Sequence, residues 1–227
     1  MFKRLRDMLV HRRIARERDR ALRARFGHSR EELRALFPCP LDLTQVSDLQ
    51  ERSLKYPAVS SLVHSLNVNA FYAHFQSESN QVDRIVKGAT TGFNRVDENS
   101  YVKSAENKGS CHLFISIGEE FSGAILSIIS DDISVFERIA EANSSPPPPW
   151  VAFPDVDEPL KLGSLQGDLE YWWDGYWLPF WENLSSEERV MYLQKYEATD
   201  DWRQCIWLHG TEVSEFLGRA LSQSDQE

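Results

Sequence analysis

Aromatic rings and carboxylates occur together in one short stretch of this 227-residue chain. Seven of the first eleven residues of Tyr171–Leu184, YWWDGYWLPFWENL, are aromatic, and acidic residues lie within and just before the stretch. Trp and Tyr supply much of the binding energy at protein interfaces, and carboxylates attract basic partners. The pattern predicts a surface that binds a protein partner, formed by Asp168, Glu170, Trp172, Trp173, Asp174, Tyr176, Trp177 and Glu182.

An aromatic core is the competing interpretation of the same rings. In a helix, Trp173, Trp177 and Trp181 fall four residues apart on one face. Large apolar side chains are usually inside, where they remove the most area from water. The core under this interpretation contains Trp150, Trp173, Trp177, Trp202 and Trp207. Because one helix face cannot hold all seven rings, some would remain partly exposed.

A carboxylate-dependent hydrolase is the alternative function. Glu170 with Asp174, or Asp174 with Glu182, could act as general acid and base, with the aromatic rings as a platform for the substrate. Such pairs also arise by chance in a chain with 35 acidic residues. Carboxylates that converge in a closed pocket would favour the hydrolase, whereas an open acidic face would favour the binding protein.

No metal, cofactor or nucleophile motif stands out. Cys111 with His112, and Cys205 with His209, bring soft ligands close in sequence, but the CxxC and HExxH patterns are absent. The phosphate-binding patterns GxxxxGK and GxGxxG are absent as well. The sequence therefore predicts neither a metal nor a cofactor. Three widely spaced cysteines suit a reducing compartment.

Long apolar segments are missing from the sequence. The best candidate, Ala124–Ile129, is far shorter than the roughly 18 residues that a membrane-spanning helix needs. The first residues include only the short apolar run Met8–Val10, which is less than a secretory signal requires. We therefore expect a cytoplasmic protein without a membrane span.

The net charge of −10 is divided unevenly along the chain. Residues 1–34 contain twelve Lys and Arg against five Asp and Glu, whereas the remaining residues contain thirteen against thirty. Platforms that stack nucleic acid bases normally lie among basic residues, so the acidic surroundings of the aromatic stretch disfavour nucleic acid as its partner. A basic protein is the partner that the charge favours.

The basic first helix, expected over residues 1–26, has three possible uses. It could bind nucleic acid or anionic lipid, it could dock onto the acidic body of its own or a neighbouring chain, or it could be solvated. Because the rest of the chain repels polyanions, the last two are favoured, and the helix is a candidate for self-association.

Local signals predict several further helices. Ser29–Glu32 and Ser185–Glu188 match the capping box that begins a helix. The first of these helices should end at Pro38, and the second should turn its apolar residues inward, which are Val190, Met191 and Leu193. Apolar spacings of three and four predict helices between residues 57 and 73 and from residue 211 onward.

The clearest strand signal covers residues 111–117 and 124–129, with a turn at Gly118-Glu119-Glu120. A helix capped by Asp131 or Asp132 should follow. The tetraproline within residues 143–149 is typical of a stiff spacer before another strand, Trp150–Phe153.

These elements predict an α+β protein with N-terminal helices, a small antiparallel sheet at about residues 110–153 and a Trp-rich helical C-terminal part. The basic residues 1–37 would form a helical segment and residues 38–227 an acidic domain, with a possible sub-boundary at residues 143–149. The predicted function is an acidic protein-binding module that neutralises a basic partner, such as a toxin or nuclease. The analogy with bacterial immunity proteins and antitoxins rests on shared size, acidity and lack of a catalytic motif.

Overall fold

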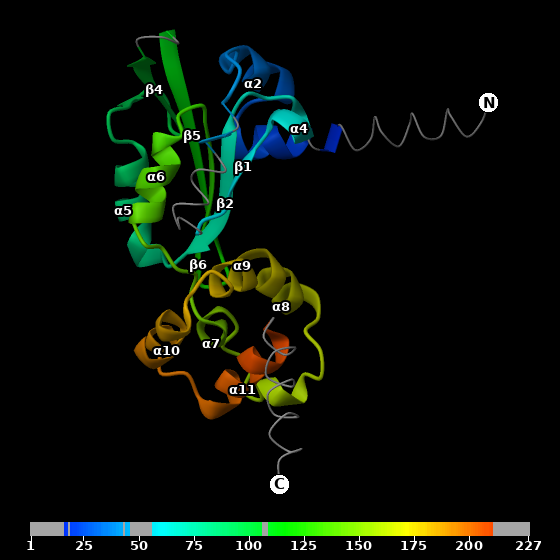
Figure 1. Ribbon diagram of the computed structural model, residues 1–227. Coiled ribbons are helices and arrows are strands. Elements are labelled where there is room, and N and C mark those ends of the chain that lie inside the picture. The colour runs from blue at the N-terminus through cyan, green and yellow to red at the C-terminus, as the bar shows by residue number, and fades with distance from the viewer. Residues whose placement is uncertain (1–15, 18, 43, 46–55, 106–108, 211–227) are drawn as a thin grey trace, which may run out of the picture. The chain divides into compact units, whose positions relative to one another are not determined.

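The protein has an α+β fold around a six-stranded antiparallel sheet, as the computed structural model shows (Figure 1). The structure describes residues 16–17, 19–42, 44–45, 56–105 and 109–210. The strand order is β1-β2-β6-β5-β4-β3. The predicted fold class is confirmed, but the sheet begins well before residue 110, because four of its six strands lie between residues 59 and 105.

Two compact units make up the chain. Unit 1 contains residues 1–74, 80–118 and 125–144, and unit 2 contains residues 75–79, 119–124 and 145–227. The strands are β1 (Val59–Ser61), β2 (Phe71–Ser77), β3 (Asn94–Arg95), β4 (Ser100–Ala105), β5 (Gly109–Glu120) and β6 (Gly123–Ser130). The helices before, between and just after these strands are α2 (Arg30–Leu36), α4 (Val63–Leu66), a 3₁₀ turn (Ser79–Gln81), α5 (Val82–Ala89) and α6 (Ser134–Glu141). Residues 19–26 are helical too.

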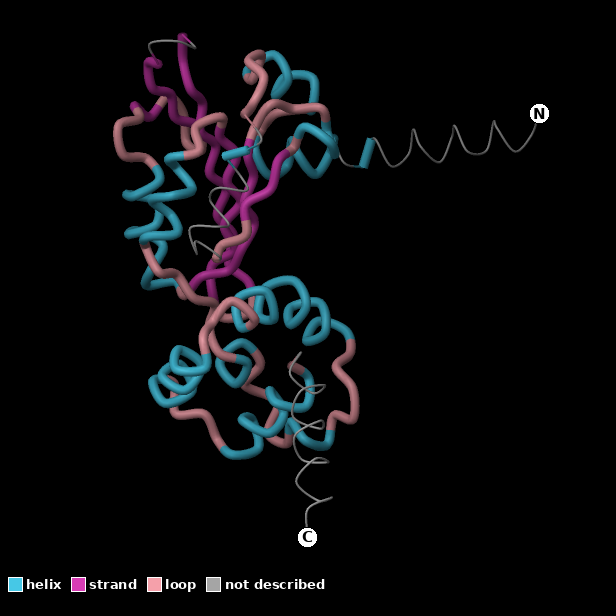
Figure 2. The backbone as a smooth tube through the Cα atoms, viewed as in Figure 1, coloured by secondary structure: helices cyan, strands magenta, loops and turns pink. Residues whose placement is uncertain are grey.

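Helices and loops form most of unit 2 (Figure 2). They are α7 (Pro149–Ala152), a 3₁₀ turn (Pro159–Lys161), α8 (Gly167–Trp172), a π turn (Trp173–Trp177), α9 (Leu178–Trp181), α10 (Ser186–Lys195) and α11 (Asp200–His209).

In unit 1, side chains that alternate along the strands cover both faces of the sheet. Phe71 of β2 packs against Phe136 of α6, with ring centroids 6.1 Å apart. Its neighbour Tyr72 points to the opposite face, because successive strand residues alternate. There it packs against an apolar cluster of Phe26, Leu33, Phe37, Leu62, Val68, Ala70, Phe114 and Ile129. Figure 1 accordingly shows α5 and α6 on one side of the sheet and α2 on the other.

Both predicted capping boxes are confirmed. The Ser29 hydroxyl accepts from the Glu32 N–H while the Glu32 carboxylate accepts from the Ser29 N–H, and Ser185 and Glu188 repeat the arrangement. The first of these helices ends before Pro38 as expected. The inward residue of α10 is Tyr192, however, whereas Val190 and Met191 are exposed, so that part of the prediction is wrong.

The helix predicted between residues 57 and 73 is also wrong. The segment forms β1, the single turn of α4 and the start of β2. Asn67, in the left-handed conformation with φ 54°, ends α4. In β2 the side chains of Phe71, Ala73 and Phe75 are buried with a period of two. Pairing within the sheet decides this conformation, and the spacing of local apolar residues cannot reveal it.

The segment with the tetraproline is not an exposed spacer, because Ser144 to Pro149 are all buried. In unit 2 the Glu78 N–H donates to the Ser145 carbonyl at 2.9 Å, and the Tyr192 hydroxyl donates to the Pro146 carbonyl at 2.8 Å. The strand predicted after it is the short helix α7. The strands predicted at 111–117 and 124–129 are present within β5 and β6, but their turn lies at Phe121 and Ser122. The helix predicted over residues 1–26 is present at residues 16–17 and 19–26, while residues 1–15 and the helix predicted from residue 211 lie outside the described residues.

The half-buried His74 of β2 should make the stability of the protein depend on pH. Burial, together with the nearby Arg25 charge, lowers the pKa of His74 from its ordinary 6.5 to about 4. The unfolded chain therefore takes up a proton first as the pH falls below 6.5, and stability is lost between pH 6.5 and 4. Allowing for partial exposure, we expect a loss of about 1 kcal/mol between pH 7 and 5.

Urea unfolding of His74→Gln and His64→Gln at both pH values tests this expectation. Only the first substitution should remove the extra loss at pH 5, because the His64 side chain is exposed. An identical pH dependence in the wild type and His74→Gln would contradict it.

Candidate functional site

The aromatic stretch forms the core of unit 2. Trp172, Trp173, Tyr176 and Trp177 are almost completely buried, and further buried rings pack against Trp177, from Phe180, Trp181 and Tyr192. Trp177 is central: its ring centroid lies 5.8 Å from that of Trp172, 5.5 Å from that of Trp181 and 5.4 Å from that of Tyr192. The rings therefore stack on one another rather than on a substrate.

A π turn arranges these rings. Between Trp173 and Trp177 the helix widens, and residues five apart become neighbours. Trp172 stacks on Trp177 at an interplanar angle of 19°, and the Tyr171 ring lies 6.0 Å from that of Tyr176. The wider turn accommodates Pro179, which has no N–H to donate to the carbonyl four residues back. It also lets the helix bury more aromatic side chains than a regular helix could place on one face.

The eight residues predicted to bind a partner separate into two groups. Trp172, Trp173, Tyr176 and Trp177 lie in the interior, where they cannot touch a partner in this conformation. The four acidic residues are exposed instead, and these are Asp168, Glu170, Asp174 and Glu182. The rings of the stretch therefore form part of the core, and its carboxylates form an acidic surface. Of its aromatic residues Tyr171 is the most exposed, at 57%.

Gln76, which has no exposed surface, connects the aromatic core to the hairpin turn between β5 and β6. Its Oε1 accepts a hydrogen bond from Trp172 Nε1 at 2.6 Å. Its Nε2 donates to the carbonyls of Glu120 and Phe121, at 2.8 and 3.2 Å. Because a buried amide can satisfy both kinds of partner at once, this one side chain fixes the turn against the core of unit 2.

The turn that Gln76 holds is strained. Phe121 and Ser122 have φ angles of 52° and 56°, the left-handed region that glycine or asparagine usually occupies in two-residue hairpin turns. Gly123 follows, and a Cβ there would lie 2.9 Å from Gln76 Nε2 and from the Ser77 carbonyl oxygen. Strain of about 1–3 kcal/mol at a bulky residue persists only where the surroundings impose it, and it is most common at functional positions.

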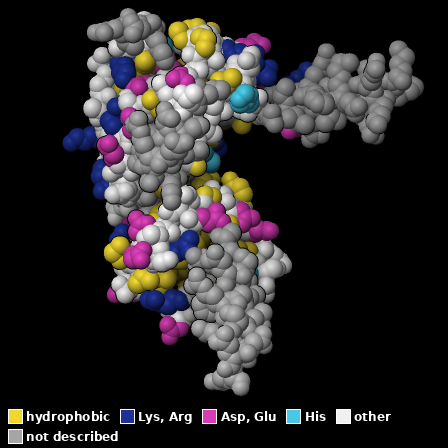
Figure 3. Space-filling view, viewed as in Figure 1, with side chains coloured by type: hydrophobic (Ala, Val, Ile, Leu, Met, Phe, Trp, Pro, Cys, Tyr) yellow, Lys and Arg dark blue, Asp and Glu magenta, His cyan; other side chains and the backbone are white. Residues whose placement is uncertain are grey.

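The strained turn brings Phe121 to a small aromatic face. Its ring centroid lies 5.5 Å from that of Phe153 and 6.3 Å from that of Tyr171. Asp168 and Asp174 lie three residues before and after Tyr171, so they flank it on the helix. We call Phe121, Phe153, Tyr171, Asp168 and Asp174 the Phe121–Tyr171 face. In Figure 3, acidic side chains gather near α8 beside hydrophobic ones.

Negative charge dominates unit 2. Its described residues include fifteen Asp and Glu but only four Lys and Arg. Lys161 pairs with Glu158 at 2.6 Å and Lys195 with Glu78 at 3.7 Å. Within the described part of the chain, Asp168 and Asp174 have no ion-pair or hydrogen-bond partner. Their charge is therefore available to a basic partner.

The four exposed carboxylates do not converge in either of two cavities in the structure. One, of about 290 Å³, lies in unit 1. The other, of about 190 Å³ in unit 2, is lined by Trp181, Arg189, Leu193, Arg203, Ile206, Trp207 and Gly210. An acid and base that cleave a glycosidic bond must face one substrate from a shared site. Asp168, Glu170 and Asp174 are exposed and line neither cavity.

Cysteines and histidines do not gather at one place in the described part of the chain. Cys111 lies in unit 1 and Cys205 in unit 2, and the described residues contain no group of three or more His, Cys, Asp and Glu that could hold a metal ion. Burial raises the pKa of the Cys205 thiol to about 11, which keeps it protonated at neutral pH.

Three residues of the site escaped the sequence analysis. Gln76 lies 96 residues from Trp172, so nothing in its neighbourhood in sequence reveals the hydrogen bond. Phe121 lies in a turn without the usual Asn-Gly signal. Tyr171 belonged to the aromatic stretch, and only its exposure in the folded protein distinguishes it from the other rings.

Comparisons with models of known protein families, with curated proteins and with solved structures gave no match. Among the described residues, no helix is both long and apolar enough to cross a membrane. Any functional assignment therefore depends on the geometry of the chain itself.

Proposed function

We propose that the protein binds a basic protein partner through the Phe121–Tyr171 face and neutralises it, in the manner of a bacterial immunity protein or antitoxin. The observation that carries this proposal is the strained turn, which keeps Phe121 beside Tyr171 although Phe is costly in a left-handed conformation. A turn that served only to connect β5 and β6 would be more stable with Asn or Gly at this position.

The two kinds of side chain on the face would have different roles in binding. Phe121 and Tyr171 would be the apolar anchors, because partly exposed aromatic rings dominate the binding energy of interfaces. Asp168 and Asp174 would form a charged rim, which attracts a basic partner and accelerates the encounter more than it strengthens the complex. This division predicts that the aromatic residues control the dissociation rate and the carboxylates control the dependence on salt.

Phe121→Asn is the most informative substitution. It removes the anchor and leaves a residue that tolerates the left-handed conformation, so we expect the free energy of unfolding to change by less than about 1 kcal/mol. Binding to the partner should weaken at least tenfold, which corresponds to the loss of one anchor of about 1.4 kcal/mol or more. Met191→Ala is the control, because Met191 is an exposed apolar residue of unit 2 that lies on α10, outside the Phe121–Tyr171 face.

The experiment begins with capture of the partner from the source cells on the tagged full-length protein, followed by titration of the purified partner. The proposal requires a partner of high isoelectric point that binds the wild type and Met191→Ala alike, binds Phe121→Asn and Tyr171→Ala weakly, and dissociates as salt is raised. Replacement of Asp168 and Asp174 by Asn should reduce the salt dependence. A partner whose affinity is unchanged by Phe121→Asn would overturn the proposal.

A further inference from the structure

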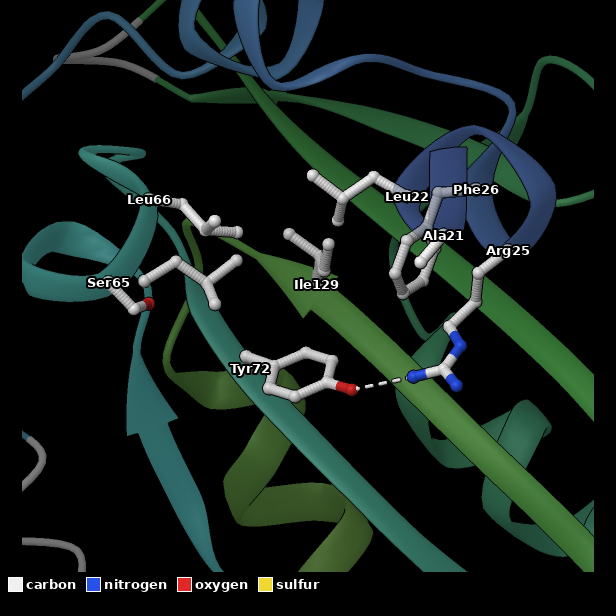
Figure 4. Close-up of a pocket in the computed structure, with 9 residues that line it drawn as sticks. Ala21, Leu22, Arg25, Phe26, Ser65, Leu66, Tyr72 and Ile129 are labelled. Carbon is white, nitrogen blue, oxygen red and sulfur yellow. Dashed lines mark hydrogen bonds between the residues drawn. The ribbon is translucent and has the colours of Figure 1, made fainter. Parts of the chain in front are cut away.

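A cavity lies in unit 1, on the sheet face that the helical residues 19–26 cover. The cavity there has a volume of about 290 Å³. Its walls are mainly apolar and come from residues 19–26, from α4 with the residue before it, and from β2 and β6 (Figure 4); the apolar lining includes Leu22, Phe26, Leu62, Leu66 and Ile129. The volume is close to the lower end of the range of about 300–1,000 Å³ found for small-molecule sites.

Two polar side chains meet at the edge of this apolar cavity. The Arg25 guanidinium donates from Nη1 to the Tyr72 hydroxyl oxygen at 3.0 Å, and Figure 4 shows both groups directed toward each other on one side of the cavity. Because the Tyr72 oxygen accepts from Arg25, its own O–H proton can be donated elsewhere. The guanidinium carries five N–H donors in a planar fork and stays charged at any physiological pH.

Among the groups around Tyr72, Arg25 carries the positive charge, whereas His74 is neutral. The Tyr72 ring stacks on that of His74, with centroids 6.2 Å apart and planes 7° apart, and His74 Nδ1 lies 2.8 Å from the Ser127 hydroxyl. Burial and the Arg25 charge keep His74 neutral at pH 7. The hydrogen bond between Arg25 and Tyr72 joins residues 47 apart in sequence, which fixes the helix against the sheet at the cavity.

We propose that this cavity binds a small carboxylic acid with an unbranched apolar tail. The tail would lie among Leu22, Leu66 and Ile129, and the carboxylate would accept hydrogen bonds from Arg25 and Tyr72. Charge-assisted hydrogen bonds from a guanidinium fit the two oxygens of a carboxylate. The volume is too small for both acyl chains of a phospholipid, which favours a free acid over a membrane lipid.

Decanoate is a suitable probe, with decanol and decyltrimethylammonium as neutral and cationic analogues of the same tail length. We expect decanoate to bind the full-length protein with saturation in calorimetric titrations, and both analogues to bind at least about tenfold more weakly. Arg25→Gln should weaken decanoate binding by about tenfold. Arg23→Gln is the matched control, since it removes the same charge from the same helix at a residue that faces Glu32.

A variant that fills the cavity provides a second test. Ala21 is exposed and lines the cavity from a helix, so Ala21→Trp adds volume there without removing a contact of the core. It should abolish decanoate binding while circular dichroism shows an unchanged helix content. Absence of saturable decanoate binding to the wild type, or equal effects of Arg25→Gln and Arg23→Gln, would overturn the inference. Because this site lies in unit 1, these results do not depend on whether the Phe121–Tyr171 face of unit 2 binds a protein.

Discussion

Replacing Trp177 with alanine is expected to lower the free energy of unfolding by about 3–5 kcal/mol, the range found when a large buried aromatic side chain is removed from a core. Trp177 has no exposed surface, and its ring touches those of Trp172, Trp181 and Tyr192. The cavity that alanine leaves cannot close easily, because the π turn fixes the backbone around it. Urea unfolding followed by tryptophan fluorescence and circular dichroism measures the loss.

Two further substitutions separate the role of Trp177 from a general effect of losing tryptophan. Trp207→Ala should cost less than about 1 kcal/mol, because that side chain is 37% exposed. Trp177→Phe should cost much less than Trp177→Ala, since the Trp177 indole N–H is buried without an acceptor among the described residues and phenylalanine removes that unsatisfied donor. Equal losses for Trp177→Ala and Trp207→Ala would show that Trp177 is not the centre of the core.

Gln76→Leu is expected to lower the free energy of unfolding by about 3 kcal/mol, although leucine is apolar and of similar size. It leaves the buried Trp172 N–H without its acceptor, at about 1–3 kcal/mol, and removes the donor that the Glu120 carbonyl accepts from. It also releases the strained turn at Phe121, so partner binding should weaken together with stability. Gln194→Leu on the exposed surface of α10 is the matched control and should change stability by less than about 0.5 kcal/mol.

Gln76→Glu tests the direction of the hydrogen bonds. An ionised carboxylate can accept from Trp172 but cannot donate to the carbonyls of Glu120 and Phe121, whereas a protonated one can do both. Burial should raise the pKa of the new carboxyl, so this variant should regain stability relative to the wild type as the pH falls from 7 to 5. A variant whose deficit is the same at both pH values would contradict the proposed role of the amide nitrogen.

Part of the fold could be predicted because its causes are local. The capping boxes at Ser29 and Ser185 each join groups three residues apart, so four consecutive residues contain the whole interaction. The apolar residues of β5 and β6 likewise predict two adjacent strands and the helix that follows them. The segment between residues 57 and 73 had an equally good local pattern, and it was misleading because its partner strand β6 lies about fifty residues further on.

The sequence by itself determined the charge of the chain, the concentration of aromatic residues at 171–181 and the α+β class. Only the tertiary structure decided that most of those rings are core, that Phe121 stands beside Tyr171, and that Arg25 meets Tyr72. The physical reason is that burial and long-range hydrogen bonds depend on which distant segments supply the surrounding surface. A sequence pattern specifies what a side chain can do, whereas packing decides whether it faces the interior or a partner.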